Sequence, residues 1–557
     1  MDTRRLVLFV IFSMSILMLW DSWQRQHAPI EANHSSTSSV GVSQQNLEGN
    51  TKISTRVDSD YKLLSNQRIL VSTDLYKAEI ESTGGDLRRL ELLKHRAANN
   101  DKSNFVLLDD SATPMTYVAQ TGLIGADLPT HKTVFTSASK NYQMQEGKDT
   151  LDVRLSWVGT GVMVDKIYTF HRNKYSIDVN YEIKNNSLIS VTPTVYYQII
   201  HDNESNQGSK MMPSFTGGSY FTEEKKFKKV KFTSFTDNDK NKDPLGVIAN
   251  DGWVGLLQHY FVSAWIPKEG LKREFYAEKL SDHIYRIGSR SSLPSIAPGA
   301  SLTIPARLYS GPQTKNDLIE TAPGLEYTVD YGWLKIVASP LFWILSKIND
   351  LVHNWGVAII LLTMLIKACF YPLSAKSYRS MAQMRELAPR LELMKQKFGD
   401  DRQKMQIAMM EMYKKEKINP MSGCLPILIQ IPVFISLYWM LLGSVELRHA
   451  PFFGWIQDLS APDTLFGTVF GMPIGLLPII MGMSMIVQTK LNPKPTDPIQ
   501  AKVMTWMPVI FSIFFFFFPA GLVLYWVVNN IISIWQQWYV NKSIHEAALI
   551  KKSGGNH

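Results

Sequence analysis

The chain has 557 residues, 45% of them hydrophobic, and a formal net charge of +9 at pH 7. This length exceeds the roughly 100–200 residues of a typical domain. Apolar residues crowd into the first twenty and the last two hundred positions, which excludes a wholly soluble protein and indicates a membrane protein with one large hydrophilic insert. The positive charge suits anionic lipid headgroups or an RNA-rich partner, and charge alone does not choose between them.

Residues 1–23 contain the apolar run Leu6–Trp20, which follows Arg4 and Arg5. A run of this length fits either a cleaved signal peptide or an uncleaved anchor. No small-x-small cleavage site follows it, so we expect a transmembrane anchor with the N-terminus in the cytoplasm. Residues 24–58 are rich in Ser, Asn, Gln and Thr, a composition that predicts a flexible linker.

Residues 59–330 alternate between apolar and polar side chains, as in Thr150–Val158 (TLDVRLSWV) and Lys174–Ile183 (KYSIDVNYEI). Gly, Asn and Pro turns separate such segments, as at Ser82–Asp86 (STGGD). This pattern predicts an antiparallel all-β sandwich of many strands, with a short helix at Lys315–Thr321. The insert contains no cysteine and therefore needs no disulfide.

Residues 331–354 place apolar side chains at every third or fourth position, which predicts an amphipathic helix at the membrane interface, kinked at Pro340. A span over residues 355–372 follows. Residues 373–419 carry eleven Lys or Arg against six Asp or Glu and predict a helical hairpin. Phe398–Asp401 (FGDD) is expected to end its first arm and cap its second.

The region 420–540 contains four more apolar runs, at Gly423–Leu442, Met472–Gln488, Val503–Phe518 and Gly521–Trp538. Each is close to the roughly 17–25 residues that a helix needs to cross a bilayer. With the anchor and residues 355–372, they make six predicted spans. Lys and Arg concentrate in the segments that this count puts on one side, including the tail 541–557. Both termini and the hairpin are therefore predicted to be cytoplasmic, and the β domain lies on the opposite side.

Lys367 is the only charged residue of the apolar stretch Trp355–Tyr371, and the other long apolar runs contain no Asp or Glu. A charge at the centre of a span costs roughly 2.5–3.5 kcal/mol, so it suggests a functional site. The alternative is that this lysine, near one end of the span, reaches the lipid headgroups. Other polar residues are also predicted at membrane depth, namely Thr363, Gln430, Ser484, Ser512, Asn529, Asn530 and Ser533. They are expected either to form hydrogen bonds between helices or to line a wet cationic groove together with Lys367.

Short motifs mark the C-terminal half, namely Lys367–Ser374 (KACFYPLS), Phe398–Asp401 (FGDD), Asn419–Pro426 (NPMSGCLP), Gly443–Arg448 (GSVELR), Asp497–Pro498 (DP), Met507–Phe511 (MPVIF) and Phe518–Trp526 (FPAGLVLYW). Together they resemble the Oxa/Alb/YidC family of bacterial membrane protein insertases over about Tyr331 to Val540. The resemblance implies the Gram-negative form of the family. That form is a multi-domain protein of the bacterial inner membrane, with an α-helical core of five spans, an N-terminal anchor span and an inserted all-β periplasmic supersandwich domain.

The resemblance also implies a function, that of an insertase and chaperone for membrane proteins rather than an enzyme. A hydrophilic groove open to the cytoplasm would hold the polar tail of an arriving segment while its apolar part slides into lipid. The predicted groove residues are Lys367, Gln430, Thr363 and Asn529, the last from its polarity at membrane depth. The predicted sliding surface consists of Ile431, Phe434, Phe514, Tyr525 and Trp526.

This chain departs from the family at two of these positions. The family usually has arginine where Lys367 stands, and a second tyrosine is common at the position of Trp526. Lysine keeps the positive charge but lacks the planar fork with which arginine binds a carboxylate through two hydrogen bonds. The resemblance implies nascent membrane proteins, the Sec translocon (SecYEG, SecDF), the ribosome, the signal recognition particle pathway and membrane lipids as partners, and no DNA.

Two other functional classes stay open from the residues alone. A solute transporter or channel with a periplasmic binding domain also uses intramembrane charges and broken helices, although the spans show no inverted repeat. The exported domain could instead be a carbohydrate-binding or enzymatic module, yet His201, Asp202 and Glu204 show no recognisable catalytic spacing. The chain contains neither a G-x-x-x-x-G-K-[ST] loop nor an H-E-x-x-H helix, so no cofactor or metal is predicted.

Overall fold

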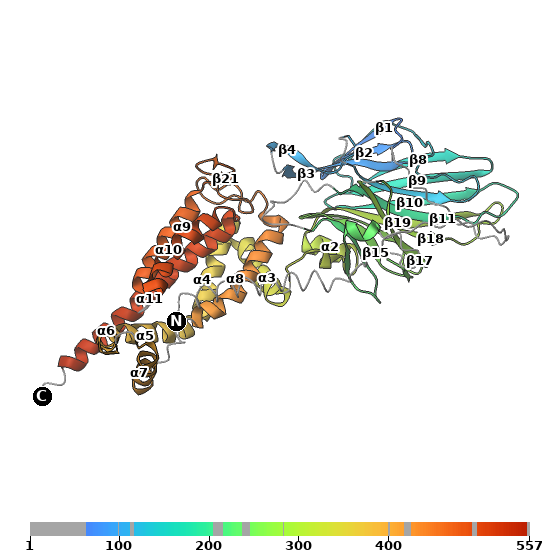
Figure 1. Ribbon diagram of the computed structural model, residues 1–557. Coiled ribbons are helices and arrows are strands. Elements are labelled where there is room, and N and C mark those ends of the chain that lie inside the picture. Colours follow the sequence, from blue (N-terminus) through green and yellow to red (C-terminus); the bar gives the residue numbers. More distant parts are fainter. Residues whose placement is uncertain are drawn as a thin grey trace, which may run out of the picture.

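The structure, a computed structural model, describes residues 63–97, 100–111, 116–203, 215–236, 245–281, 283–332, 334–398, 401–416, 425–492 and 498–553. The predicted anchor (1–23) and linker (24–58) lie outside these residues. Within the described part, Figure 1 shows a β domain at one end of the molecule and a bundle of helices at the other.

The first sheet of the β domain has ten strands, and β4 pairs with β3 at its side. In spatial order the strands are β14 (Val247–Ala249), β17 (Arg273–Lys279), β18 (Ile284–Ser292), β11 (Thr194–Asp202), β5 (Tyr117–Ile124), β3 (Asp86–Ala97), β2 (Tyr76–Glu81), β1 (Arg68–Ser72) and β7 (Asn141–Gln143), with β4 spanning Asn100–Leu108. The pairing is antiparallel except between β1 and β7, which run parallel.

The second sheet has nine strands and is antiparallel. Its spatial order is β13 (Lys228–Val230), β12 (Gly217–Phe221), β15 (Trp253–Leu257), β16 (Phe261–Pro267), β19 (Ser301–Pro312), β10 (Ser176–Asn185), β9 (Val162–His171), β8 (Thr150–Val158) and β6 (Thr136–Ser137). The predicted strand at Thr150–Val158 is β8 itself, because its alternating side chains let one face be buried.

The two sheets pack face to face around one hydrophobic core. Trp265 of β16 reaches across the core, where its ring lies 5.3 Å from that of Tyr197 and its Nε1 donates to the carbonyl of Gln198 at 3.0 Å. The indole thus buries its apolar surface without leaving its N–H unpaired. Short helical segments flank the sheets, namely η1 (Phe232–Thr236), α2 (Lys315–Thr321) and η2 (Leu325–Thr328), and α2 has the predicted bounds.

The helical region begins with α3 (Lys335–Val352), which contains Pro340. Its other elements are α4 (Trp355–Cys369), α5 (Tyr371–Glu386), α6 (Ala388–Phe398), α7 (Arg402–Lys415), α8 (Leu425–Gly443), η4 (Val445–Leu447), the strands β20 (Thr468–Val469) and β21 (Met472–Pro473), α9 (Leu476–Leu491), α10 (Pro498–Phe515) and α11 (Ala520–Ser553). The last helix continues through most of the stretch predicted as a separate tail, residues 541–557.

By length and mean hydropathy, no described helix taken singly meets the criterion for crossing a membrane. The consecutive helices α4 and α5 meet it together, with a bend of 67° between them. The predicted number of spans and the N-terminal anchor therefore stay predictions.

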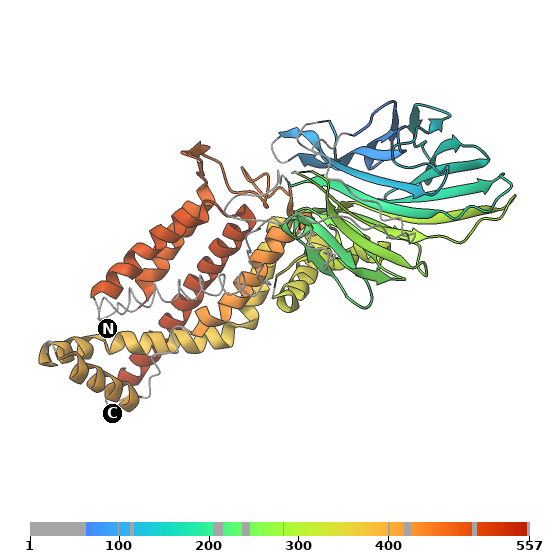
Figure 2. The same cartoon turned by 45° about the vertical axis from the view of Figure 1, so that its right-hand side comes forward.

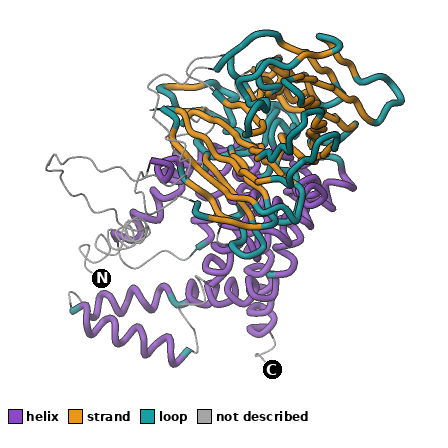
Figure 3. Tube along the Cα trace, turned by 90° about the vertical axis from the view of Figure 1, so that its right-hand side faces the viewer, coloured by secondary structure: helices purple, strands orange, loops and turns teal. Residues whose placement is uncertain are grey.

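The predicted hairpin differs from its expected form in its first arm. That arm consists of two helices, since α5 ends at Glu386 and α6 begins at Ala388. The pairing that makes a hairpin is between α6 and α7, which appear in Figure 3 as two neighbouring helices. An ion pair links their far ends, where Arg390 Nη1 lies 2.9 Å from Glu416 Oε1. The predicted cap is present, because the Asp401 side chain accepts from the Lys404 backbone N–H.

The two regions are joined by contacts beyond the covalent connection at α3. Phe105 of β4 and Phe261 of β16 stack with their centroids 4.2 Å apart. The guanidinium carbon of Arg448, which follows η4, lies 5.1 Å and 5.5 Å from these two centroids. His259 Nε2 donates to the carbonyl of Leu442 at 3.0 Å. The loop after α8 is thereby docked onto the β domain.

Candidate functional site: a polar cavity around a lysine

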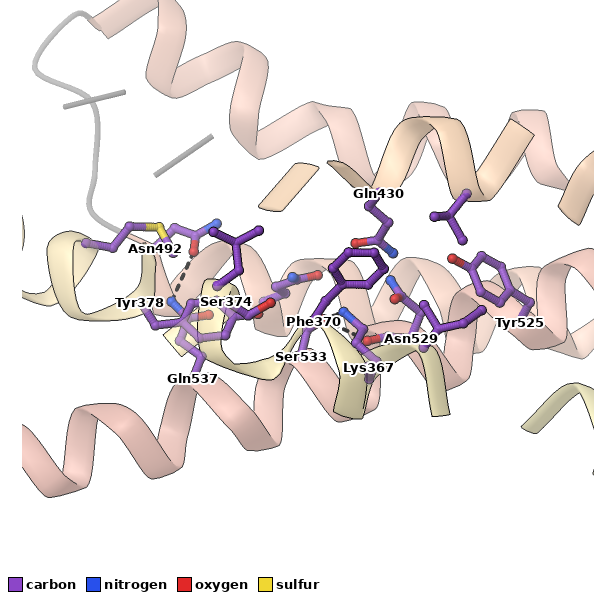
Figure 4. Close-up of a pocket in the computed structure, with 15 residues that line it drawn as sticks. Lys367, Phe370, Ser374, Tyr378, Gln430, Asn492, Tyr525, Asn529, Ser533 and Gln537 are labelled. Carbon is purple, nitrogen blue, oxygen red and sulfur yellow. Dashed lines mark hydrogen bonds between the residues drawn. The ribbon is translucent and has the colours of Figure 1, made fainter. Parts of the chain in front are cut away.

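A cavity of about 100 Å³ lies where α4, α5, α8, α9 and α11 meet (Figure 4). That volume holds several waters, since one water needs roughly 10–15 Å³ by this measure. Most of the polar atoms come from neutral side chains, and none of the described lining residues is acidic. The lining residues are Ile366, Lys367, Phe370, Leu373, Ser374, Tyr378, Met381, Gln430, Val433, Gln488, Asn492, Tyr525, Asn529, Ser533 and Gln537.

Lys367 supplies the positive charge of the cavity. It sits in the last turn of α4, where the C-terminal end of the helix dipole favours a cation. Its side chain is 9% exposed, and Nζ donates to Ser533 Oγ at 2.7 Å. Ser533 Oγ in turn donates to the Asn529 carbonyl at 2.7 Å. The ammonium is therefore solvated by a hydroxyl of α11 rather than neutralised by a carboxylate.

The other polar contacts connect the walls of the cavity. Gln430 of α8 interacts with the hydroxyl of Tyr525 on α11. Gln537 Nε2 donates to Asn492 Oδ1 and to the Leu491 carbonyl, both at 3.2 Å, and ties α11 to the end of α9. Amides and hydroxyls of this kind can solvate a polar peptide segment without binding one sequence tightly.

Three of the four predicted groove residues share this cavity: Lys367, Gln430 and Asn529. Thr363 does not line it. The Thr363 side chain is 1% exposed, and Oγ1 donates to the Ile359 carbonyl of its own helix at 2.7 Å. A threonine in a helix commonly satisfies its hydroxyl in this way, so polarity alone did not indicate where the side chain points.

The predicted sliding-surface residues divide into two groups. Ile431 and Phe514 are exposed on the outer face of the helices. Phe434, Trp526 and Tyr525 instead pack against one another, with the Phe434 and Trp526 centroids 4.7 Å apart and edge to face. Tyr525 also lines the cavity, so this residue connects the aromatic cluster to the polar site.

Gln537 was not predicted to line the groove, and Ser533 was predicted only as one of several polar residues at membrane depth. The signal that could have found them is a polar stripe, because Asn529, Ser533 and Gln537 recur every four residues and so share one face of α11. The neighbouring Asn530 lies on another face, where Nδ2 donates to Ser484 Oγ of α9 at 3.1 Å. Among the described residues, no group of three or more His, Cys, Asp or Glu side chains is arranged to hold a metal ion.

The fold and the cavity define a class of protein whose helical core encloses a cationic polar site and carries a large β sandwich. Two family models match the chain, the YidC periplasmic domain over residues 68–344 and the 60Kd inner membrane protein over residues 347–547. The chain is similar to the "Membrane protein insertase YidC" of Methylobacillus flagellatus, with 63% identity over 99% of both chains. It is 49% identical to the protein of the same name from Aromatoleum aromaticum, over 100% of this chain and 99% of the relative.

A solved structure of an active YidC insertase covers 86% of this chain and 93% of its own, with 20% identity and a TM-score of 0.40. The chain belongs to the YidC family of membrane protein insertases. It is therefore an inner membrane protein with a periplasmic domain and not a catalytic enzyme. This assignment favours the predicted insertase over the solute transporter or channel.

Proposed function

We propose that the cavity around Lys367 receives the hydrophilic tail of a nascent membrane protein while the apolar part of that client passes into lipid. The observation that carries the proposal is the environment of Lys367, whose ammonium is hydrogen-bonded to Ser533 in a cavity without acidic lining residues among those described. Such a charge attracts acidic or polar segments and lowers the free energy of moving them into the membrane.

The proposed orientation puts the cavity on the cytoplasmic side. Lys367 lies at the end of α4 next to α5, and Figure 1 shows α5, α6 and α7 at the end of the bundle remote from the β domain. The concentration of Lys and Arg in residues 373–419 and 541–557 supports the same orientation. Both termini and the α6–α7 hairpin are then cytoplasmic, and the β domain is periplasmic.

The exposed apolar side chains beside the cavity fit a path into lipid. Ile431 of α8 and Phe514 of α10 are exposed, and Phe434 packs against both Trp526 and the cavity residue Tyr525. A client segment moving along this surface exchanges contacts with apolar side chains for contacts with acyl chains. The exposure of its own apolar surface to water therefore changes little. Thr363 is not part of the proposed groove, because its hydroxyl is bonded within α4.

We further propose that clients arrive from the ribosome, through the signal recognition particle pathway, and that the chain works alone or beside the Sec translocon. The basic end of α11, which carries Lys542, supports a contact with ribosomal RNA. Shortening the chain after residue 541 is expected to weaken cosedimentation with ribosomes at low salt and to leave client binding by the cavity intact.

The experiment that tests the cavity compares Lys367→Glu with Lys367→Arg. Unit charges about 8 Å apart interact by roughly 2 kcal/mol at an effective dielectric constant of 20. Reversing the charge replaces this attraction by an equal repulsion, a change of about 4 kcal/mol, and should slow insertion of an acidic client by up to about a thousandfold. Insertion is measured by protease protection in cells depleted of the native protein, for one client with an acidic tail and its counterpart with a neutral tail. Equal activity of the two variants on the acidic client would contradict the proposal.

A further inference from the structure

The loop between α8 and α9 exposes more apolar surface than its position on a folded protein requires. Six large apolar side chains are more than a third exposed within it, namely Phe453, Trp455, Leu465, Phe466, Val469 and Phe470. The stretch Thr464–Gly475 contains no charged residue. Contiguous apolar exposure of this kind marks a surface that contacts another apolar phase.

The tip of this loop is a strained hairpin with an aromatic residue at its turn. Val469 pairs with Met472, so Phe470 and Gly471 are the two turn residues, and both have positive φ, 52° and 77°. Such a turn favours Asn-Gly, and a residue with a side chain larger than Asn costs about 1–2 kcal/mol in this conformation. Phe470 is 104% exposed, so no packing within the protein compensates for that cost.

The exposed tip stands on an ordered base. The Phe466 N–H donates to the Ile474 carbonyl at 2.9 Å, which extends the hairpin below its two short strands. Asp463 accepts from the Trp455 Nε1 at 3.2 Å and from the Leu477 N–H at 2.9 Å, at the start of α9. These bonds hold the exposed side chains in place, so their exposure is a property of the fold.

The position of the hairpin at the N-terminal end of α9 indicates that its apolar side chains contact lipid. It directly precedes α9, whose sixteen residues span about 24 Å at 1.5 Å per residue, less than the roughly 30 Å of a bilayer's hydrocarbon core. The apolar exposure continues along the bundle at Met483 of α9 and Ile510 of α10. Figure 2 shows the hairpin at the end of the bundle near the β domain, standing apart from that domain.

We propose that the β20–β21 hairpin inserts Phe470 and its apolar neighbours into the periplasmic leaflet of the membrane, as an anchor for the outer end of α9. The partner is a lipid surface, because the hairpin lacks the charges that would pair with a protein partner and continues the apolar face of the bundle. Phe, Leu and Val are among the side chains whose insertion into a bilayer is favourable. The inference rests on the membrane orientation given under the proposed function.

The test uses the full chain with Cys369 and Cys424 replaced by serine and a single new cysteine carrying the environment-sensitive NBD fluorophore. Phe470→Cys places the probe at the tip. Leu188→Cys is the matched control, because Leu188 is 96% exposed at a turn of the β domain, on the same side of the proposed membrane. Both proteins are reconstituted into phosphatidylcholine and phosphatidylglycerol vesicles and titrated with iodide or with nitroxide-labelled acyl chains.

The Phe470 probe is expected to emit at shorter wavelength than the Leu188 probe, to be quenched by the nitroxide lipid and to be protected from iodide. The Leu188 probe is expected to show the opposite order. Tip quenching by iodide equal to that of the control overturns the proposal, and so does protection from both quenchers, which would assign the tip to a protein contact. Thr468→Cys repeats the measurement if Phe470→Cys does not fold.

Client insertion by the cysteine-free parent is measured in the same vesicles. Client insertion tests only the proposed function, whereas the quenching experiment tests only the position of the hairpin. Failure of one proposal can therefore be distinguished from failure of the other. Phe470→Asn supplies an independent check, because asparagine relieves the strained turn and removes the aromatic anchor. Spin labels at Thr468 should then move from lipid to water while the hairpin pairing persists. Unchanged depth in Phe470→Asn contradicts a role for this side chain.

Discussion

Among the described residues, the β domain and the helical core each bury one lysine, and the surroundings of the two charges differ. In the β domain Lys166 is fully buried, donates to the carbonyls of Gly84 and Thr121 at 3.0 Å and 3.2 Å, and lies 3.9 Å from Asp86 Oδ1. In the helical core Lys367 donates to the hydroxyl of Ser533, and the described cavity lining contains no acid. The ammonium of Lys166 is therefore compensated by groups of its own domain. The ammonium of Lys367 remains available to interact with a client segment that enters the cavity.

A buried lysine can therefore have a structural role in one region and a functional role in another. Burial raises the pKa of Asp86 to about 6 and lowers that of Lys166 to about 8, so both are charged near neutral pH and each compensates the other. A buried pair is costly to break from one side, because the remaining charge is left in a medium of low dielectric constant. The described cavity lining offers Lys367 no carboxylate partner. Replacing Lys367 with a neutral residue therefore removes the desolvation cost of its charge and leaves no buried carboxylate unpaired.

The largest expected effect is on the β domain. Asp86→Asn leaves Lys166 without its countercharge and should lower the free energy of unfolding of this domain by about 3–5 kcal/mol. Hydrogen exchange of β9 peptides in the full chain measures the loss. Asp165→Asn is the control, since its partner Arg154, 2.7 Å away, is half-exposed, and surface pairs contribute at most about 1 kcal/mol. Equal losses in the two variants would remove the distinction drawn between buried and surface pairs.

The β domain should also respond to acid through His131. Burial, followed by the neighbouring charge of Lys132, lowers the pKa of His131 from 6.5 to about 4. Between these values the unfolded state binds more protons than the folded state, so the free energy of unfolding falls as the pH falls from about 6.5 to about 4. His131→Gln should remove about 3 kcal/mol of that loss. Exchange at pH 7 and pH 4 measures it, with the exposed His283→Gln as control, and parallel curves for wild type and His131→Gln would contradict the assignment.

Replacing the lysine of the core should separate stability from function. Lys367→Met removes an attraction of roughly 2 kcal/mol for an acidic tail and should slow insertion of such a client about thirtyfold. Because no carboxylate is left behind, the unfolding temperature of the helical core in detergent should stay the same or rise. A fall in that temperature comparable to the one expected for Asp86→Asn would mean that Lys367 is structural.

The smallest expected effect concerns the contact between the two regions. Arg448→Ala loses the stacking on Phe105 and Phe261, which contributes about 1–2 kcal/mol for a partly desolvated guanidinium. The distance between spin labels on the β domain and on α9 should become more broadly distributed. Arg448→Lys keeps the charge without the planar group and should lie between alanine and wild type. An unchanged distribution in the alanine variant would show that the connection at α3 suffices.

Local patterns in the sequence were enough for many elements. The alternation at Thr150–Val158 predicted β8, the segment Lys315–Thr321 predicted α2, and Asp401 is the cap that its position before a helix indicated. Phe398 ends α6 where the FGDD motif predicted, whereas the break within the first arm lies before Pro389 rather than at it. The first arm of the hairpin divides at Leu387, two residues before Pro389, because proline has no backbone N–H to donate to the Arg385 carbonyl and its ring crowds that carbonyl.

The sequence by itself determined the class of the protein, because apolar length, turn chemistry and the charge of Lys367 act locally and can be read along the chain. Tertiary structure decided which polar groups meet. Ser533 contacts Lys367 across 166 positions of sequence, whereas Thr363, one turn from that lysine, bonds to its own helix. Asn529 and Asn530 are adjacent, yet they face the cavity and α9 respectively. A hydroxyl or amide is satisfied by many partners, and only the packing of the helices selects one.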